Sequence, residues 1–330
     1  MNQLVTFTAA QHAPALVAAV GERAAYRYLE FFTAQIRNPH TRRAYARAVG
    51  EFCAWLDIAC GVTSILAVNS VHVAAWLEEL GRERFDANGQ ASRLTAPSIK
   101  QRFSAVRMMF DWLAVGGVLP FNPATAVRGP KHVVKRGKTP VLVPDEARQL
   151  LDSIDVGTPM GLRDRALIGL MVYTFARIGA ATAMTVGDVY VQERRLWVNL
   201  HEKGGKFVAL PCHHNLEAYL HAYIDGAGIG DDAGGPLFRT IQRGTGKLSR
   251  TPLAQQNAHD MVRSRMTAAG IATLAGNHTF RATGITAYLK NGGTLEGAAA
   301  IASHASTRTT QLYDRRSDQV TLDEVERILV

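Results

Sequence analysis

The sequence predicts a mainly α-helical protein of two domains, with a small β-hairpin in the second domain. The chain has 330 residues, which is too long for one small domain, and 47% of them are hydrophobic, which is enough to fill two cores. Apolar residues recur at helical spacing along most of the chain. Strict alternation of apolar and polar residues occurs only around residues 196–210, on either side of a Gly-Gly pair.

Two amphipathic helices with basic outer faces organise the first predicted domain, residues 1–127. Each has an apolar stripe at helical spacing. The stripes are Tyr45, Val49, Phe52 and Leu56 in the first helix, and Ile99, Phe103, Val106, Phe110 and Leu113 in the second. The basic residues lying mostly off these stripes are Arg42, Arg43, Arg47, Lys100 and Arg107. One such face alone is typical of a solvated surface, but two in one small domain favour a surface that meets phosphates.

A basic linker is predicted at residues 128–142. Glycine and Asn-Pro pairs end the helical region before it, and no acidic residue occurs between Asp111 and Asp145. Five Lys or Arg residues lie between Arg128 and Lys138, among them Lys135 and Arg136. This linker is either a flexible spacer or an extended segment that follows a phosphate backbone.

The second predicted domain, residues 143–330, begins where Val143 and Pro144 precede two acids, a pattern that suits the first turn of a helix. A buried helix is expected at RDRALIGLMVYTF, followed by the hairpin, and helical patterns return between residues 251 and 305. An amphipathic helix with a capping box is expected at residues 321–329.

Composition narrows the class of function. A net charge of +9 and a pI near 9.7 suit a polyanionic partner. The three cysteines have neither disulfide nor metal-ligand spacing, so we expect no metal and a reducing, cytoplasmic location. The charge-free stretch 58–77 is long enough to cross a bilayer, but polar residues interrupt it, which indicates a helix end, a loop and a new helix rather than a membrane span.

The second domain carries groups suited to phosphodiester cleavage without a metal, which needs a nucleophile, cations and an acid. Arg177 is expected at the end of the buried helix, and Tyr313 follows His304 by nine residues. His278 and Arg281 form an H-x-x-R pair whose spacing places both on one helical face. A guanidinium stays charged and can bond two phosphate oxygens at once. Alone, H-x-x-R is also typical of a surface pair.

At these residues the sequence resembles the tyrosine recombinase (phage integrase) family over nearly its full length. ARIGAATAMTVGDV, HTFRATGITAYLKNGG and ASHASTRTTQLYDRR resemble its two arginine boxes and its His-to-Tyr segment. NPHTRRAYARAVGEFCAWL and TAPSIKQRFSAVRMMFDWLAVGGVLPFNPA are similar to its N-terminal domain. The resemblance implies a helical, SAM-like core-binding domain followed by an α+β catalytic domain.

The resemblance also implies a catalytic set. Its members are Arg177, Lys203, His278, Arg281, His304 and Tyr313. Tyr313 would attack the scissile phosphate, leaving a 3′-phosphotyrosyl link and a free 5′-hydroxyl. Lys203, in a hairpin that resembles the family's lysine-bearing β-turn, would protonate the leaving oxygen, with Lys206 as its competitor. The two arginines and His304 would supply a cationic pocket, and His278 would assist deprotonation of the phenol, whose ordinary pKa is about 10.

No cofactor is implied, and the implied partner is double-stranded DNA with specific recombination sites, bound by a homotetramer. The task could be integration, excision, resolution or transposition of a mobile genetic element.

The sequence departs from the family's pattern at several positions. Ala180 stands where the family has an acid three positions after the first arginine, so either another residue orients the catalytic groups or the site is less ordered. Other residues that are usual in the family are also replaced, by Phe175-Ala176 before Arg177, by Ala282 after Arg281 and by Ala302-Ser303 before His304. The departure at Ala180 leaves open one alternative to an active recombinase, a catalytically impaired DNA-binding regulator or accessory subunit. A second alternative, from the same chemistry, is an enzyme resembling type IB topoisomerases that relaxes DNA, which the linker and the N-terminal domain disfavour.

Overall fold

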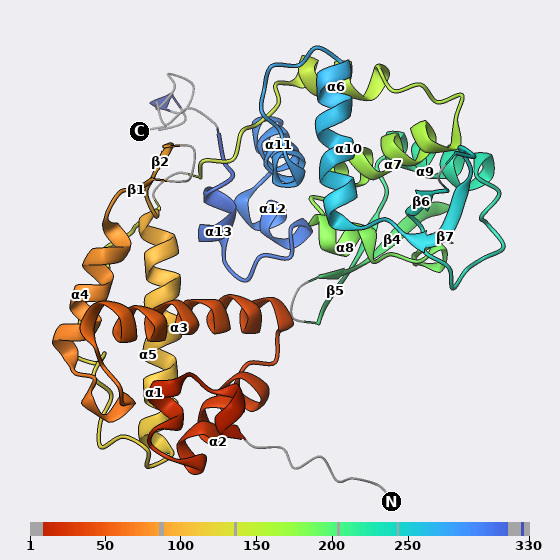
Figure 1. The fold of residues 1–330 in the computed structure, drawn as a ribbon. Coiled ribbons are helices and arrows are strands. Elements are labelled where there is room, and N and C mark those ends of the chain that lie inside the picture. The colour runs from red at the N-terminus through yellow and green to blue at the C-terminus, as the bar shows by residue number, and fades with distance from the viewer. Residues whose placement is uncertain are drawn as a thin grey trace, which may run out of the picture. The chain divides into compact units, whose positions relative to one another are not determined.

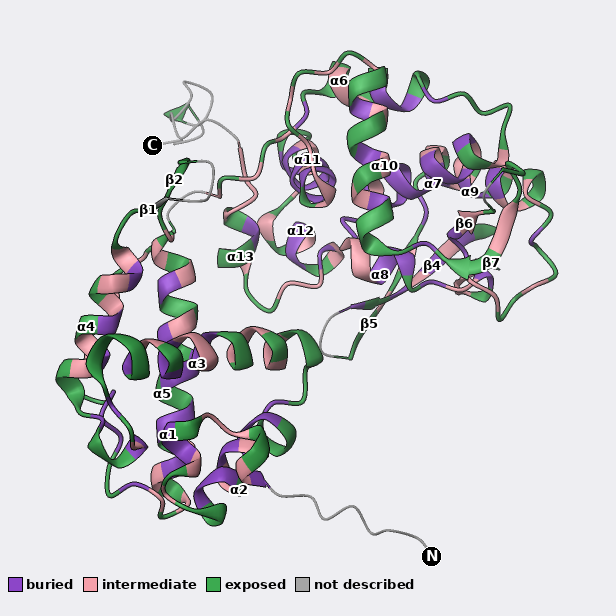
Figure 2. Cartoon of the chain, in the orientation of Figure 1, coloured by how far each residue is buried: buried purple, intermediate pink, exposed green. Residues whose placement is uncertain are grey.

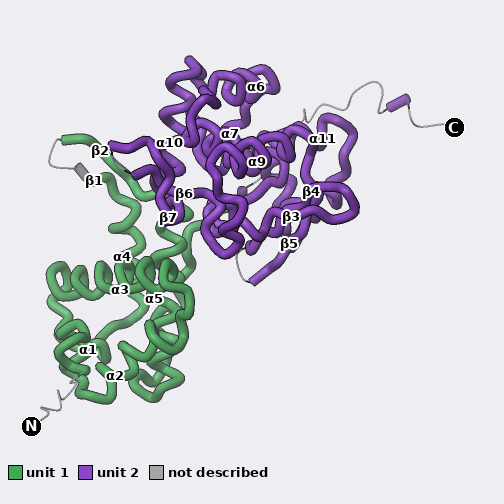
Figure 3. The backbone as a smooth tube through the Cα atoms, turned by 90° about the vertical axis from the view of Figure 1, so that its right-hand side faces the viewer, with its two compact units in different colours: residues 1–133 green, residues 134–330 purple. Residues whose placement is uncertain are grey.

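The computed structural model of the chain describes residues 9–85, 89–134, 137–202, 205–242, 244–315 and 325–326 (Figure 1). The chain divides into two compact units, residues 1–133 and 134–330 (Figure 3). The division falls inside the segment predicted to be the linker. Lys135, Arg136, Lys203 and the predicted helix 321–329, apart from Val325 and Glu326, lie outside the described residues.

The first unit is a helical domain with a short hairpin. Its elements are α1 (Ala15–Ala18), α2 (Glu22–Glu30), α3 (Pro39–Cys60), α4 (Ser70–Gly81), β1 (Arg84–Phe85), β2 (Ala91–Ser92) and α5 (Ala96–Val115). The Asn38 side chain accepts hydrogen bonds from the first free backbone amides of α3, and Pro39 needs none, so α3 begins at this point. In the core, the Phe52 ring meets Trp76 and Phe110 edge-on, with centroids 4.9 and 5.8 Å away.

The charge-free stretch 58–77 folds as predicted. Helix α3 ends at Cys60, Gly61 takes a left-handed conformation (φ 62°), and α4 begins at Ser70 behind the N-cap Asn69. Among the residues that the structure describes, each helix is either too short or too polar to span a bilayer.

The second unit combines helices with two small antiparallel sheets. Its helices are α6 (Pro144–Asp152), α7 (Pro159–Tyr173), α8 (Ile178–Thr182), α9 (His214–Gly226), α10 (Gln255–Ala268), α11 (Asn277–Lys290), α12 (Leu295–Ile301) and α13 (Thr307–Gln311). Its strands are β3 (Val189–Gln192), β4 (Arg195–Glu202), β5 (Lys206–Pro211), β6 (Arg239–Ile241) and β7 (Leu248–Pro252).

The predicted hairpin is confirmed as β4 and β5, with Val198 opposite Leu210 and Glu202 opposite Lys206. The sequence did not predict β3, which adds a third strand beside β4, or the hairpin of β6 and β7. Both are too short for a period-2 pattern to stand out from their surroundings.

Helices α7 and α11 pack against each other in the second unit, and both are largely buried (Figure 2). Gly284 lets them approach closely, because a Cβ at this position would lie 2.1 Å from the Val172 carbonyl oxygen. Helices α11, α12 and α13 lie side by side (Figure 1). The chain between α7 and α8, the start of α11 and the turn after α13 therefore meet in one region.

Candidate active site

Arg177 precedes a helix rather than ending one, which corrects the prediction. Helix α7 ends at Tyr173, and Phe175 takes a left-handed conformation (φ 55°) that a helix cannot continue. Arg177 is extended and is the N-cap residue of α8. Its side chain is 33% exposed and makes an ion pair with Glu202 on β4.

Arg281 is completely buried in the second turn of α11. Its guanidinium donates hydrogen bonds to the carbonyl oxygens of Phe175 and Ala302, and to Nε2 of His304 at 2.7 Å. Among the described residues, its Nε has no hydrogen-bond partner. Burial, followed by the charge of Arg177, lowers the pKa of Arg281 to about 10, so the side chain remains cationic at neutral pH.

His304 is a neutral ring in this arrangement. Its Nε2 faces a guanidinium, which can only donate, so Nδ1 carries the proton and donates to Thr310 Oγ1 at 2.8 Å. Burial, followed by the charges of Arg281 and Arg177, lowers the pKa of His304 to about 4. The sequence-based expectation that His304 adds positive charge therefore does not hold here, and the positive charge near it comes from cationic neighbours.

Tyr313 lies in the same cluster, directly after α13. Its ring is half-buried and stacks on His304, with centroids 5.6 Å apart and planes inclined by 18°. It packs against a small apolar group that includes Phe175 and Ile285. Its carbonyl accepts a hydrogen bond from Thr286 Oγ1 at 2.8 Å. Arg177, Arg281, His304 and Tyr313, from four separate segments, are thus brought together.

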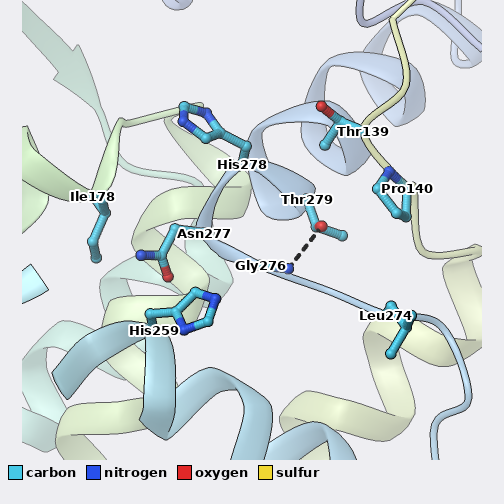
Figure 4. Close-up of a pocket in the computed structure, with 9 residues that line it drawn as sticks. All are labelled: Thr139, Pro140, Ile178, His259, Leu274, Gly276, Asn277, His278 and Thr279. Carbon is cyan, nitrogen blue, oxygen red and sulfur yellow. Dashed lines mark hydrogen bonds between the residues drawn. The ribbon is translucent and has the colours of Figure 1, made fainter. Parts of the chain in front are cut away.

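His278 is the exposed histidine of this region, in the first turn of α11. It lines a surface pocket of about 340 Å³ together with Ile178 and His259, and Figure 4 shows Asn277 between the two histidines. Desolvation, followed by the charges of Arg281 and Arg177, lowers the pKa of His278. The predicted shared face with Arg281 holds only in part, since Arg281 points into the core and His278 to the surface.

The two candidate lysines follow the last residue of β4 in the sequence. Lys203 is outside the described residues, and Lys206 is exposed at the start of β5. The charge of Lys206 contributes to the low pKa of His304, so this end of the hairpin is near the cluster. The choice between the two lysines stays open.

Glu202 is a member of the cluster that sequence reasoning missed. Its carboxylate pairs with the Arg177 side chain and lies 3.7 Å from Nη1 of Arg281. Leu196, Val198 and Leu200 precede it at alternate positions of β4 and are all buried. Because side chains alternate across a strand, Glu202 points inward with them. An acid in the inward register of a strand is the signal that could have identified it.

The basic residues predicted to meet DNA in the first unit differ in their surroundings. Arg43, Arg47, Lys100 and Arg107 are exposed. Arg42 instead donates from Nε and Nη2 to the Ile36 carbonyl oxygen, at 3.1 and 2.9 Å, and so closes the turn before α3. Arg47 pairs with Glu51 at 2.8 Å.

Two family profiles match the chain. The profile described as "Phage integrase family" matches residues 140–319, and "Phage integrase, N-terminal SAM-like domain" matches residues 26–116. The chain belongs to the phage integrase family. Members of this family are DNA strand-exchange enzymes, and the chain is accordingly a site-specific tyrosine recombinase.

Individual relatives cover most of the chain. Tyrosine recombinase XerC of Mycobacterium sp. (strain JLS) is 27% identical over 285 residues, 84% of this chain and 88% of the relative. Tyrosine recombinase XerD of Corynebacterium glutamicum is 28% identical over 281 residues, covering 84% and 87%.

Solved structures share the fold. The XerH site-specific recombinase bound to a palindromic difH substrate, in a post-cleavage complex, has a TM-score of 0.68 at 17% identity and covers 99% of this chain and 90% of its own. A lambda integrase dimer bound to a COC′ core site has a TM-score of 0.66 at 18% identity, covering 90% and 79%. The predicted fold class, a helical SAM-like domain followed by an α+β recombinase domain, is confirmed.

Proposed function

We propose that the chain cleaves and rejoins DNA at specific sites through a 3′-phosphotyrosyl link to Tyr313. The observation that carries the proposal is the cluster of Arg177, Arg281, His304 and Tyr313, in which residues up to 136 positions apart in the sequence meet within one unit. Two guanidinium groups beside a tyrosine ring suit the negative charge that develops on a phosphate under attack.

Arg177 is the arginine that first meets a phosphate, because Arg281 has no exposed surface in this arrangement. Nε of Arg281 has no hydrogen-bond partner among the described residues, so it is the donor that remains for a phosphate oxygen that enters this buried region. The negative charge of the phosphate then offsets the two arginines and raises the pKa of His304. Bound substrate therefore favours the cationic form of His304.

The reaction balances without a cofactor. The Tyr313 oxygen forms a bond to phosphorus while the bond from phosphorus to the 5′-oxygen breaks. His278 accepts the phenol proton, and Lys203 or its neighbour Lys206 supplies a proton to the leaving 5′-oxygen. Attack by a 5′-hydroxyl of a partner strand reverses these steps and frees Tyr313.

The partner is double-stranded DNA that carries specific recombination sites, acted on in the cytoplasm by a homotetramer. Support for the assembly comes from a solved lambda integrase tetramer bound to a Holliday junction, at a TM-score of 0.64 and 18% identity. Arg43, Arg47, Lys100 and Arg107 are the phosphate contacts proposed for the first unit, to which Lys135 and Arg136 of the linker are added. Arg42, which the sequence placed in this set, is not proposed as a phosphate contact, because its guanidinium donates to the Ile36 carbonyl oxygen.

Covalent trapping tests the proposal and identifies the target site in the same experiment. The protein is incubated with sheared genomic DNA of its source organism, denatured in detergent, and the protein-linked fragments are recovered and sequenced. We expect fragments that share one sequence, joined through a 3′-phosphate. Tyr313→Phe should give no adduct, whereas Tyr288→Phe, in the same apolar group, should still give it.

Two other outcomes contradict the proposal. An adduct that persists in Tyr313→Phe places the nucleophile elsewhere. Specific DNA binding by the wild type with no adduct supports a DNA-binding regulator. Once the site is known, two copies on one plasmid distinguish strand exchange, which gives recombined products, from relaxation, which gives only topoisomers.

A further inference from the structure

Glu202 is the single carboxylate that the described part of the cluster places between the two arginines. Its Oε2 accepts a hydrogen bond from Nη1 of Arg177. Its Oε1 lies 3.4 Å from the Arg177 backbone nitrogen and 3.7 Å from Nη1 of Arg281. Only 4% of the Glu202 side chain is exposed. We infer that Glu202 is a positioning residue for DNA cleavage, which holds Arg177 and Arg281 in register for one phosphate; the inference rests on the proposed function.

The charges in the cluster explain why an acid is needed. Arg177 and Arg281 are close enough for the charge of Arg177 to lower the pKa of Arg281, whereas Glu202 raises it. Two cations in a poorly solvated region repel each other, and without an anion they relax by moving apart or by turning outward. In the absence of DNA, the Glu202 carboxylate is the anion that keeps the guanidinium groups together.

The location of Glu202 ties three segments of the proposed site. It is the last residue of β4, so Lys203 follows it directly in the chain. Its bond to the Arg177 backbone fixes the start of α8, and its approach to Arg281 links β4 to α11. Position 180, in the first turn of α8, is a buried alanine. Strand β4 thus supplies, through Glu202, the acid that α8 lacks at position 180.

Glu202→Gln separates positioning from simple packing. The amide has nearly the same size, but it is uncharged, and its NH₂ group meets donors on both sides. We expect the rate of adduct formation at saturating DNA to fall about 100-fold, as for other small misplacements of catalytic groups. Affinity for the same DNA should be unchanged or higher, because the phosphate site has gained one net positive charge. A residue needed only for folding would lower both.

Further variants sharpen the test. Glu202→Asp keeps the charge but is one methylene shorter, so it should cleave faster than Glu202→Gln and more slowly than the wild type. Ala180→Asp, added to Glu202→Gln, should recover at least part of the lost rate. Glu217→Gln, on the partly exposed face of α9, is the matched control and should cleave as the wild type does.

The experiment uses the full chain and a duplex of the trapped sequence, nicked so that the short 5′-hydroxyl strand is lost after cleavage. Thermal unfolding of each variant shows that it is folded. The inference is overturned if Glu202→Gln forms the adduct at the wild-type rate, or if rate and affinity fall together with the melting temperature. If the wild type forms no adduct with any DNA, the proposed function fails, and the inference fails with it.

Discussion

Arg281 and His304 illustrate how burial changes the properties of residues that sequence can identify. The Arg281 guanidinium bonds to carbonyl oxygens that lie 106 and 21 positions away in the chain. It also donates a hydrogen bond to Nε2 of His304. Of these two members of the proposed cationic pocket, Arg281 is therefore a cation and His304 a neutral acceptor. The protonation state of His304 is thus a property of the folded arrangement.

The low pKa of His304 predicts a specific loss of stability in acid. The folded-state pKa of about 4 lies below the ordinary value of 6.5, so between these values the unfolded chain binds more protons. Stability is therefore fully present above pH 6.5 and is lost as the pH falls towards 4. Because the ring is only partly buried, we expect this one group to account for about 1–2 kcal/mol rather than the full linkage value.

Urea unfolding at pH 7 and pH 4.5 measures this effect. His304→Gln, which does not titrate, should lose about 1–2 kcal/mol less than the wild type over that interval. His278→Gln is the variant to compare with His304→Gln. It also removes a histidine whose pKa is lowered, but from an exposed position. Equal losses in the wild type and His304→Gln would show that folding does not lower the pKa of His304.

The sequence predicted which residues belong to the candidate site better than it predicted what surrounds them in the fold. The motifs identified Arg177, Arg281, His304 and Tyr313, because each is tied to a local pattern. Glu202 belongs to none of those motifs, and its role depends on two residues 25 and 79 positions away, which only the fold brings near it. Its inward-facing position in β4 could nevertheless be predicted from the alternation of the strand.

At the scale of elements, the contact of α7 with α11 sets the distance between the segments that carry Arg177 and Arg281. A Cβ at Gly284 would lie 2.1 Å from the Val172 carbonyl oxygen and 2.7 Å from the Phe175 ring, and neither neighbour is a flexible chain end. Gly284→Ala should therefore force the helices apart. We expect a loss of about 1–3 kcal/mol in the free energy of unfolding, as for other overpacked cores.

The rate of DNA cleavage should also fall in Gly284→Ala, because the hydrogen bond from Arg281 to the Phe175 carbonyl oxygen spans the contact between α7 and α11. Gly50→Ala is the matched control: it also lies within a helix, but a Cβ there meets nothing within 4 Å. That change should stabilise the first unit by roughly 0.5–1 kcal/mol, through helix propensity. Chemical denaturation and the trapping assay measure both effects, and unchanged values for Gly284→Ala would mean that the helices adjust without cost.

Long, strongly periodic elements were predictable, and short ones were not. The stripes of α3 and α5 and the alternation in β4 each repeat several times, so they stand out from the local sequence. The predicted end of α7 is wrong because its apolar run continues through Phe175, and only the left-handed conformation there ends the helix before Arg177.

At the scale of the whole molecule, the two units have separate hydrophobic cores, each made from its own residues. Length and composition predicted this organisation, because one core rarely grows to fill a chain of 330 residues. Basic residues occur in both units, so the charge that attracts a polyanion is not confined to the proposed site. The first unit should then contribute to DNA affinity without affecting the rate of DNA cleavage.

The salt dependence of DNA binding tests that contribution. Binding to each phosphate releases condensed counterions, so the slope of log K against log salt changes by about 0.9 for every phosphate that a variant no longer neutralises. Arg43→Gln combined with Arg107→Gln should make the slope less steep by roughly 2, with no change in the adduct-forming rate at saturating DNA.

Arg42→Gln is the control from the same helix as Arg43, since the Arg42 guanidinium is bound to the Ile36 carbonyl oxygen. It should leave the slope unchanged and instead lower the stability of the first unit by about 1 kcal/mol. A slope that is unaltered in the double variant, or altered equally in Arg42→Gln, would contradict this assignment of the DNA-facing surface.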